Sequence, residues 1–181
     1  MTPPTAAARF AAVYALLTAS HEAGDYWVQQ DSDAGAKGHA GHEGRAACAR
    51  HVASYTATQA LALGLAGQYL GLRLTWRRAA AGLAVSAVTH YVADRCAGHW
   101  QETGDDAPAL VRFAHDYGKG KWLTRDPGAG ALLDQAWHKA WITAAAVGGG
   151  GGGGGPPPAP PPRPPPPPRP PRARPRPPPP P

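Results

Sequence analysis

Three histidine–aspartate pairs, each with its two residues four positions apart, interrupt apolar stretches of this chain. The pairs are His21/Asp25, His90/Asp94 and Asp134/His138, and a single His51 begins a fourth such stretch. Residues four apart lie on one face of an α-helix, so each pair offers an imidazole beside a carboxylate. This combination binds divalent metal ions or transfers protons, and it is costly to bury unless it is paired or ligated.

Apolar residues recur at helical spacing along most of the chain, and strand-like alternation is essentially absent. Together with the abundance of alanine, this pattern predicts an all-α fold. We expect four main helices, at residues 5–30, 45–72, 75–95 and 131–147. Residues 31–44 are predicted to form a loop, and residues 96–130 a long irregular segment with one short helix near 108–115.

Four helices with two short connections and one long connection predict an up-down four-helix bundle. In that topology the ends of the first and third helices meet the starts of the second and fourth. The His/Asp pairs and His51 lie near those ends and starts, so all seven side chains are expected at the same end of the bundle. The sequence therefore predicts one shared polar site.

Imidazole and carboxylate groups are suitable ligands for divalent zinc, manganese or iron. We therefore predict a divalent metal site with seven candidate ligands. They are His21, Asp25, His51, His90, Asp94, Asp134 and His138. Seven groups exceed the four ligands of a closed zinc site, which fits either two ions or one ion with supporting carboxylates.

A metal ion with an open coordination position acidifies a bound water enough to attack an ester or a phosphoester. This chemistry predicts a metal-dependent hydrolase of unknown substrate, with Asp25, Asp94 and Asp134 as the candidate catalytic carboxylates. An alternative stays open, because His/Asp pairs also occur as ordinary hydrogen bonds on helix surfaces. The protein would then be a non-catalytic membrane or interaction protein with a structural His/Asp network.

The C-terminal part of the chain has a different composition from the rest. Residues 148–181 are eight glycines followed almost only by proline and arginine, a composition that cannot build a packed core. We therefore expect one helical domain at residues 5–147 and a disordered tail, which is either a genuine spacer or the product of a shifted reading frame at the gene end.

The positive charge of the chain comes mostly from this tail. The net charge is +6, with 18 basic and 12 acidic residues, and five of the basic residues are tail arginines. The body is therefore close to neutral, and we expect it to bind no nucleic acid. A nucleic-acid-binding regulator is a second alternative, which rests only on the tail and on the basic cluster at residues 73–78.

Several motifs resemble an uncharacterised bacterial and phage family, known as domain of unknown function thirty-three-oh-seven. The strings are HEAGDYWVQQDSDAGAK, HVASYT and THYVAD, and GKGKWLTRDPGAGALLDQAWHKAW resembles the actinobacterial branch. The matching positions are His21, Gly24, Asp25, Gln29, Lys37, His51, Tyr55, Thr89, His90 and Asp94. The resemblance covers about residues 15–145. It implies a small helical protein, often a membrane protein, with a His/Asp pattern similar to that of small membrane-bound metal-dependent hydrolases.

The cellular location has two alternatives. Only residues 52–72 reach the length of a membrane span, and they contain several hydroxyl and amide side chains, which favours a cytoplasmic protein. The family resemblance favours an integral membrane protein, for which the distribution of arginines predicts both termini in the cytoplasm. The first residues show no clear secretory signal, and two cysteines give no disulfide framework.

Overall fold

The computed structural model describes residues 4–150, and within that range the chain is helical with no strand. Four long helices make up most of the domain. They are α1 (Ala6–Ala23), α3 (Gly41–Tyr69), α4 (Trp76–Asp94) and α7 (Ala129–Gly150). The predicted all-α fold and its four-helix bundle are confirmed.

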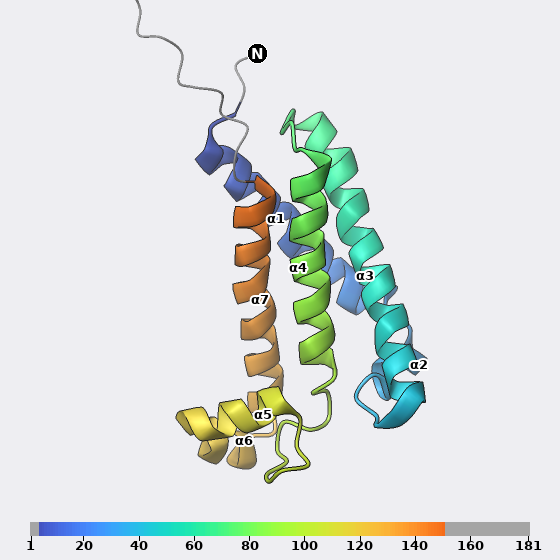
Figure 1. The fold of residues 1–181 in the computed structure, drawn as a ribbon, viewed down its shortest axis with the longest axis vertical. Coiled ribbons are helices and arrows are strands. Elements are labelled where there is room, and N and C mark those ends of the chain that lie inside the picture. The colour runs from blue at the N-terminus through green and yellow to red at the C-terminus, as the bar shows by residue number, and fades with distance from the viewer. Residues whose placement is uncertain (1–3, 151–181) are drawn as a thin grey trace, which may run out of the picture.

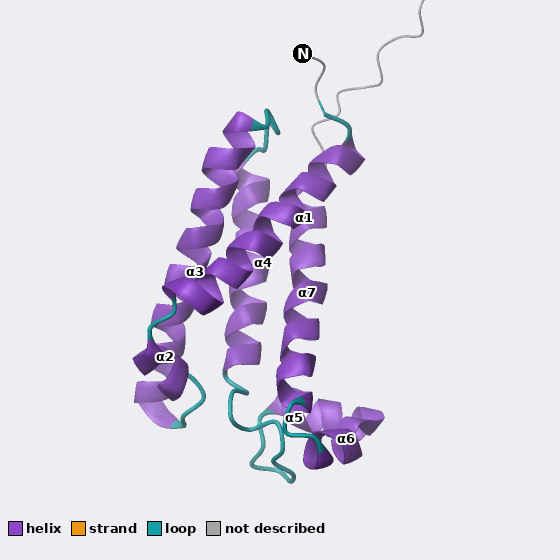
Figure 2. Cartoon of the chain, turned by 180° about the vertical axis from the view of Figure 1, so that it is seen from behind, coloured by secondary structure: helices purple, strands orange, loops and turns teal. Residues whose placement is uncertain are grey.

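The four long helices form a closed ring in which α4 contacts α3 and α7, and α1 contacts the same two helices from the other side. Figure 1 shows α4 and α7 lying side by side and running in opposite directions. The view from behind in Figure 2 shows that α1 crosses the bundle diagonally. The bundle is therefore up-down, with one oblique helix.

Small residues allow α4 and α7 to approach closely. A Cβ atom added to Gly82 would lie 2.8 Å from the carbonyl oxygen of Ala145, so no side chain fits there. Near the same end of the bundle, Val13, Leu17 and Ile142 join a buried apolar cluster of the long helices. Burial of this apolar surface stabilises the end of the bundle opposite the short helices.

The predicted loop after the first helix is partly helical. The first helix ends in a π-helical turn, η1 (Gly24–Val28), and α2 (Asp31–Ala36) follows it. Arg50 of α3 holds α2 in place, because its Nε donates to Asp33 Oδ1 at 3.1 Å. The next helix, α3, begins at Gly41, four residues before the predicted start at Arg45.

The prediction of a long irregular segment at residues 96–130 is wrong for much of its length. It contains α5 (Ala109–Ala114), the π-helical turn η2 (His115–Lys119) and α6 (Gly120–Arg125). The short helix expected near 108–115 is present as α5. Val111 and Leu123 are fully buried in a second apolar cluster with Trp100, and this burial orders the segment despite its glycines.

The last long helix continues three residues beyond its predicted end at Val147. Gly148–Gly150 are helical although glycine disfavours helices, and Gly149 and Gly150 pack against α1 near Val13 and Phe10. The prediction that the disordered tail begins at residue 148 is therefore wrong for these three glycines. The rest of the predicted tail, residues 151–181, lies outside the described residues.

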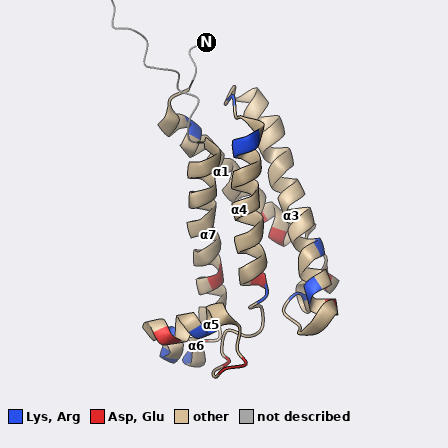
Figure 3. Cartoon of the chain, viewed as in Figure 1, with Lys and Arg blue, Asp and Glu red and all other residues tan. Residues whose placement is uncertain are grey.

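Charged side chains are distributed unevenly over the bundle. Figure 3 shows acidic residues in the middle and lower parts of the bundle, basic residues at both ends, and almost no charge on the upper part of α7. Among residues 4–150, no helix combines the length and the apolar character needed to cross a membrane.

Candidate metal centre

The structure brings all seven predicted site residues together from four sides of the bundle. They are His21 of α1, Asp25 of η1, His51 of α3, His90 and Asp94 of α4, and Asp134 and His138 of α7. All four histidines are buried, with exposed fractions of 3% or less. His51 and His138 lie about two and a half to three turns after the starts of α3 and α7, and Asp94 is the last residue of α4.

Four ligand atoms from three helical segments converge at the centre of the site. We call them the four-atom cluster: Nε2 of His51, Nε2 of His90, Oδ1 of Asp25 and Oδ2 of Asp94. The two nitrogens are 2.9 Å apart. Each nitrogen lies 3.4 Å from the Asp25 oxygen and 3.2 Å from the Asp94 oxygen. Each oxygen thus forms a triangle with the two nitrogens, and the two triangles share the His51–His90 edge.

The π-helical turn η1 carries Asp25 into the cluster. Gly24 allows the close approach, because an added Cβ would lie 3.0 Å from Cδ2 of Tyr55 on α3. The predicted pair with His21 persists across the change of helix type, with Nδ1 of His21 3.6 Å from Oδ2 of Asp25. Single π-helical turns inside α-helices occur frequently at functional sites.

The phenol ring of Tyr55 positions His90. The two rings are stacked, with centroids 3.8 Å apart and planes inclined by 18°. The Tyr55 hydroxyl lies 2.8 Å from Oγ of Ser86 and accepts a hydrogen bond of 2.8 Å from Nε2 of Gln59. These fixed contacts hold the His90 ring in one orientation.

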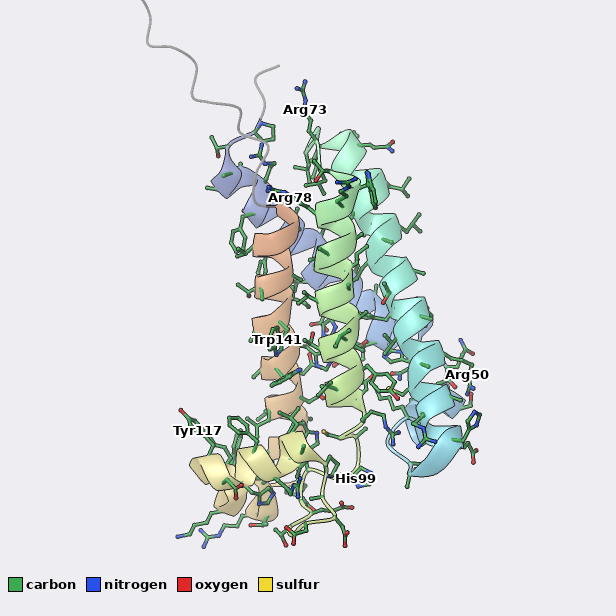
Figure 4. All side chains as sticks on the ribbon, in the orientation of Figure 1. Arg50, Arg73, Arg78, His99, Tyr117 and Trp141 are labelled. Carbon is green, nitrogen blue, oxygen red and sulfur yellow. The ribbon has the colours of Figure 1, made fainter. Side chains whose placement is uncertain are left out.

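Lys37 supports the other oxygen of Asp94. Its Nζ lies 2.9 Å from Asp94 Oδ1, which leaves Oδ2 for the four-atom cluster. The backbone around Lys37 is fixed to the end of α4, because Arg95 donates to the carbonyl oxygens of Lys37 and His39. His99, in the loop after α4 (Figure 4), adds a 2.9 Å hydrogen bond from Nε2 to the Gly38 carbonyl oxygen.

A second ligand group lies directly beside the first. One ligand atom from each of Asp94, Asp134 and His138 lies within 4.8 Å of the other two. Nδ1 of His138 lies 2.8 Å from the backbone carbonyl oxygen of Asp134 and 3.4 Å from its Oδ2. The His138 ring stacks on His21 and meets His90 edge-on, with centroid distances of 4.9 and 4.3 Å. The two groups therefore share Asp94.

Burial and neighbouring charges act on the pKa values of the cluster in opposite directions. Burial alone would raise the pKa of the Asp25 and Asp94 carboxyls, but His51 and His90 hold both below their ordinary value. Burial would lower the pKa of His51, yet the two carboxylates raise it. For His90, burial prevails and lowers the pKa. The two carboxylates and His51 thus favour each other's charged forms, whereas burial favours the neutral form of His90.

The cysteines take no part in the site. Burial raises the pKa of the Cys48 and Cys96 thiols to about 12, so both stay protonated. Each sulfur faces a backbone carbonyl oxygen of α4, at 3.8 Å and 3.5 Å. The ligands of the site are therefore nitrogen and oxygen atoms.

A cleft of about 440 Å³ reaches the site from the surface. Lys37, Asp94 and Asp134 form its polar wall, and Trp100 and Pro127 lie on other sides. Asp134 is the more accessible of the two carboxylates, with 22% of its side chain exposed against 3% for Asp94. A small molecule in the cleft would meet the edge of the second ligand group.

Helical spacing also marks the supporting residues that the sequence analysis did not assign to the site. Tyr55 and Gln59 follow His51 at intervals of four, and Ser86 precedes His90 by four, so each set lies along one helix face. No such signal marks Lys37, which comes from a connection between helices and reaches Asp94 only through the fold.

The arrangement offers a nitrogen- and oxygen-lined position for a cation beside an open cleft. Comparison with known proteins gives no relative from which a role could be transferred: no family model, curated protein or solved structure matches this chain. Membership of the family named above stays a prediction from its quoted motifs.

Proposed function

We propose that this protein binds a divalent metal ion, preferentially zinc, in the four-atom cluster of Asp25, His51, His90 and Asp94. The observation that carries the proposal is the spacing of the two histidine nitrogens from each other and from the two carboxylate oxygens. Four atoms at zinc–ligand distances of about 2.0–2.1 Å in a tetrahedron lie about 3.3–3.4 Å from one another. The five distances that involve a histidine nitrogen, one between the nitrogens and four to the carboxylate oxygens, range from 2.9 to 3.4 Å.

Hydrogen bonding alone leaves this cluster unsatisfied. The two Nε2 atoms face each other at 2.9 Å, so only one of them can carry a proton between them. Asp25 Oδ1 and Asp94 Oδ2 are buried and accept no hydrogen bond from any residue in the range 4–150. Buried acceptors without a partner are costly, and one cation would satisfy all four atoms at once.

Metal analysis of the purified full chain tests this proposal. We expect tightly held zinc after loading and dialysis, and its loss in the double variant His51→Ala plus His90→Ala. His42→Ala is the matched control, because His42 is exposed in the first turn of α3. Cobalt(II) in place of zinc should give the intense visible absorption of a tetrahedral ion. Less than about a tenth of an equivalent in the wild type, or equal retention by the double variant, would overturn the proposal.

The cleft favours a second, more specific function, that of a metal-dependent hydrolase. Asp134 is the one predicted catalytic carboxylate outside the four-atom cluster, and it lies on the cleft wall with Asp94. A water held there beside a metal ion would be acidified and could attack an ester or phosphoester bound in the cleft. Asp25 and Asp94 are then ligands in the four-atom cluster, and Asp134 is the third carboxylate, on the cleft side of the site.

Chromogenic carboxyl esters and phosphoesters, assayed with and without added metal, test the hydrolase function. Hydrolysis should require the metal, and Asp134→Asn should lower the rate about 10²–10⁴-fold. The same variant should keep the ion of the four-atom cluster, as measured by the cobalt absorption. Metal-dependent turnover that is unchanged in Asp134→Asn would contradict the role of the cleft wall.

A further inference from the structure

The structure points to a second divalent ion, bound between Asp94, Asp134 and His138 with Asp94 bridging the two ions. This inference rests on the proposed zinc site, because the bridging carboxylate is shared with it. A ligand atom from each of the three residues lies within 4.8 Å of the other two, a spacing that one ion can close by small side-chain rotations.

The protonation state of His138 suits a metal ligand. Its Nδ1 lies 2.8 Å from the Asp134 backbone carbonyl oxygen, which can only accept, so Nδ1 carries the proton and donates it. In the neutral ring, Nε2 then presents its lone pair. This Nε2 is buried, and no group in the described part of the chain makes a hydrogen bond to it. Donation from one ring nitrogen to a backbone carbonyl, with the other nitrogen left for the ion, is the usual arrangement of metal-binding histidines.

Asp94 has one oxygen for each ion. Oδ2 belongs to the four-atom cluster, at 3.2 Å from both Nε2 atoms. Oδ1 lies 2.9 Å from Lys37 Nζ, and its remaining lone pair is free to bind a cation. The edge-on contact of the His90 and His138 rings keeps the two ligand sets adjacent, as in dinuclear sites with ions about 3.5–4 Å apart.

The position of the second group explains why the hydrolase needs this ion. A tetrahedral ion in the four-atom cluster would have four protein ligands, which leaves no coordination position for water. The second group supplies only three side chains, and two of them, Asp94 and Asp134, line the cleft. An ion there keeps open positions toward the cleft for a water and a substrate oxygen.

Charge balance identifies the class of substrate. Asp25, Asp94 and Asp134 are the carboxylates of the two groups, and Lys37 is the cation that contacts them. The positive charge of two divalent ions and Lys37 exceeds the negative charge of these three carboxylates. A metal-bound hydroxide and an anionic substrate would restore neutrality, so we expect a phosphoester in preference to an uncharged carboxyl ester.

Metal stoichiometry of the full chain tests the second ion. With manganese or zinc in excess we expect about two equivalents in the wild type and about one in His138→Gln and in Asp134→Asn. His42→Gln and Asp116→Asn are matched controls with exposed side chains, and both should keep two equivalents. Circular dichroism of each variant shows whether it is folded, and the two variants serve as independent tests if one of them fails to fold.

Electron paramagnetic resonance of the manganese-loaded protein tests the bridge. We expect the spectrum of two coupled ions in the wild type and that of a single ion in His138→Gln. One equivalent in the wild type, unchanged in the two variants, would overturn the second ion and leave the proposed zinc site standing. Two equivalents without coupling would overturn the bridging role of Asp94, and no bound metal at all would overturn both proposals.

Discussion

The charges of the four-atom cluster make zinc binding dependent on pH. The two carboxylates raise the pKa of His51, so this imidazole keeps to higher pH a proton that the ion must displace. Zinc affinity should therefore fall as the pH decreases, by up to about tenfold per pH unit for each displaced proton. Calorimetry in two buffers of different ionisation enthalpy measures the released protons. Equal affinity at pH values on either side of the raised His51 pKa would contradict this account of the cluster.

These pKa shifts also determine how the stability of the metal-free protein changes with pH. The raised pKa of His51 contributes stability below the unfolded value, and this contribution is lost as the pH rises through the folded value. The lowered pKa values of Asp25 and Asp94 contribute stability above the unfolded value and lose it in acid. The lowered pKa of His90 also costs stability in acid, so the metal-free protein should lose stability as the pH falls and these groups take up protons.

Tyr55 allows the packing and hydrogen-bonding roles of one side chain to be separated. Tyr55→Phe keeps the ring stacked on His90 but leaves Ser86 and Gln59 without their shared partner. The free energy of unfolding should decrease by about 1–3 kcal/mol while zinc content stays unchanged. Urea denaturation with parallel metal analysis measures both. Loss of zinc from the folded Tyr55→Phe variant would show that the hydroxyl, and not the ring, positions His90.

At the scale of the elements, periodicity predicts the long helices because each has a continuous apolar or small-residue face. The short elements depend on contacts that no local pattern encodes. α2 is held by the Asp33–Arg50 ion pair, and α6 is ordered by the burial of Leu123 beneath α7. The site is predicted for the same reason as the long helices, since its residues repeat every four positions. Lys37 and the π-helical turn could not be predicted, because each depends on how two distant segments meet.

Gly24 tests whether the π-helical turn positions Asp25. In Gly24→Ala the new Cβ would lie 3.0 Å from Tyr55 Cδ2, so α1 and α3 must separate or the Tyr55 ring must shift. We expect overpacking to cost about 1–3 kcal/mol of stability and to weaken zinc binding measurably. Gly35→Ala in α2 is the matched control, because nothing lies within 4 Å of its added Cβ. If Gly24→Ala bound zinc as tightly as Gly35→Ala, the turn would have no positioning role.

At the scale of the whole molecule, the metal would connect segments that lie far apart along the chain. The four-atom cluster takes ligands from η1, α3 and α4, and the second group adds α7, so the ions would join all sides of the bundle. The same interior holds four buried histidines and only partly satisfied carboxylates. Without an ion this polar interior opposes folding, and with an ion it becomes a cross-link.

Zinc should therefore raise the melting temperature of the whole domain in a single transition. An ion that binds only the folded state, at a free concentration a thousandfold above its Kd, stabilises it by about 4 kcal/mol. Thermal denaturation with zinc and with a chelator measures the shift, and His51→Ala plus His90→Ala should abolish it. His42→Ala should retain the full shift, because that exposed side chain is outside both ligand groups. An equal shift in the double variant would mean that the stabilising ion binds elsewhere. Zinc bound to the His/Asp residues would then not be what stabilises the bundle.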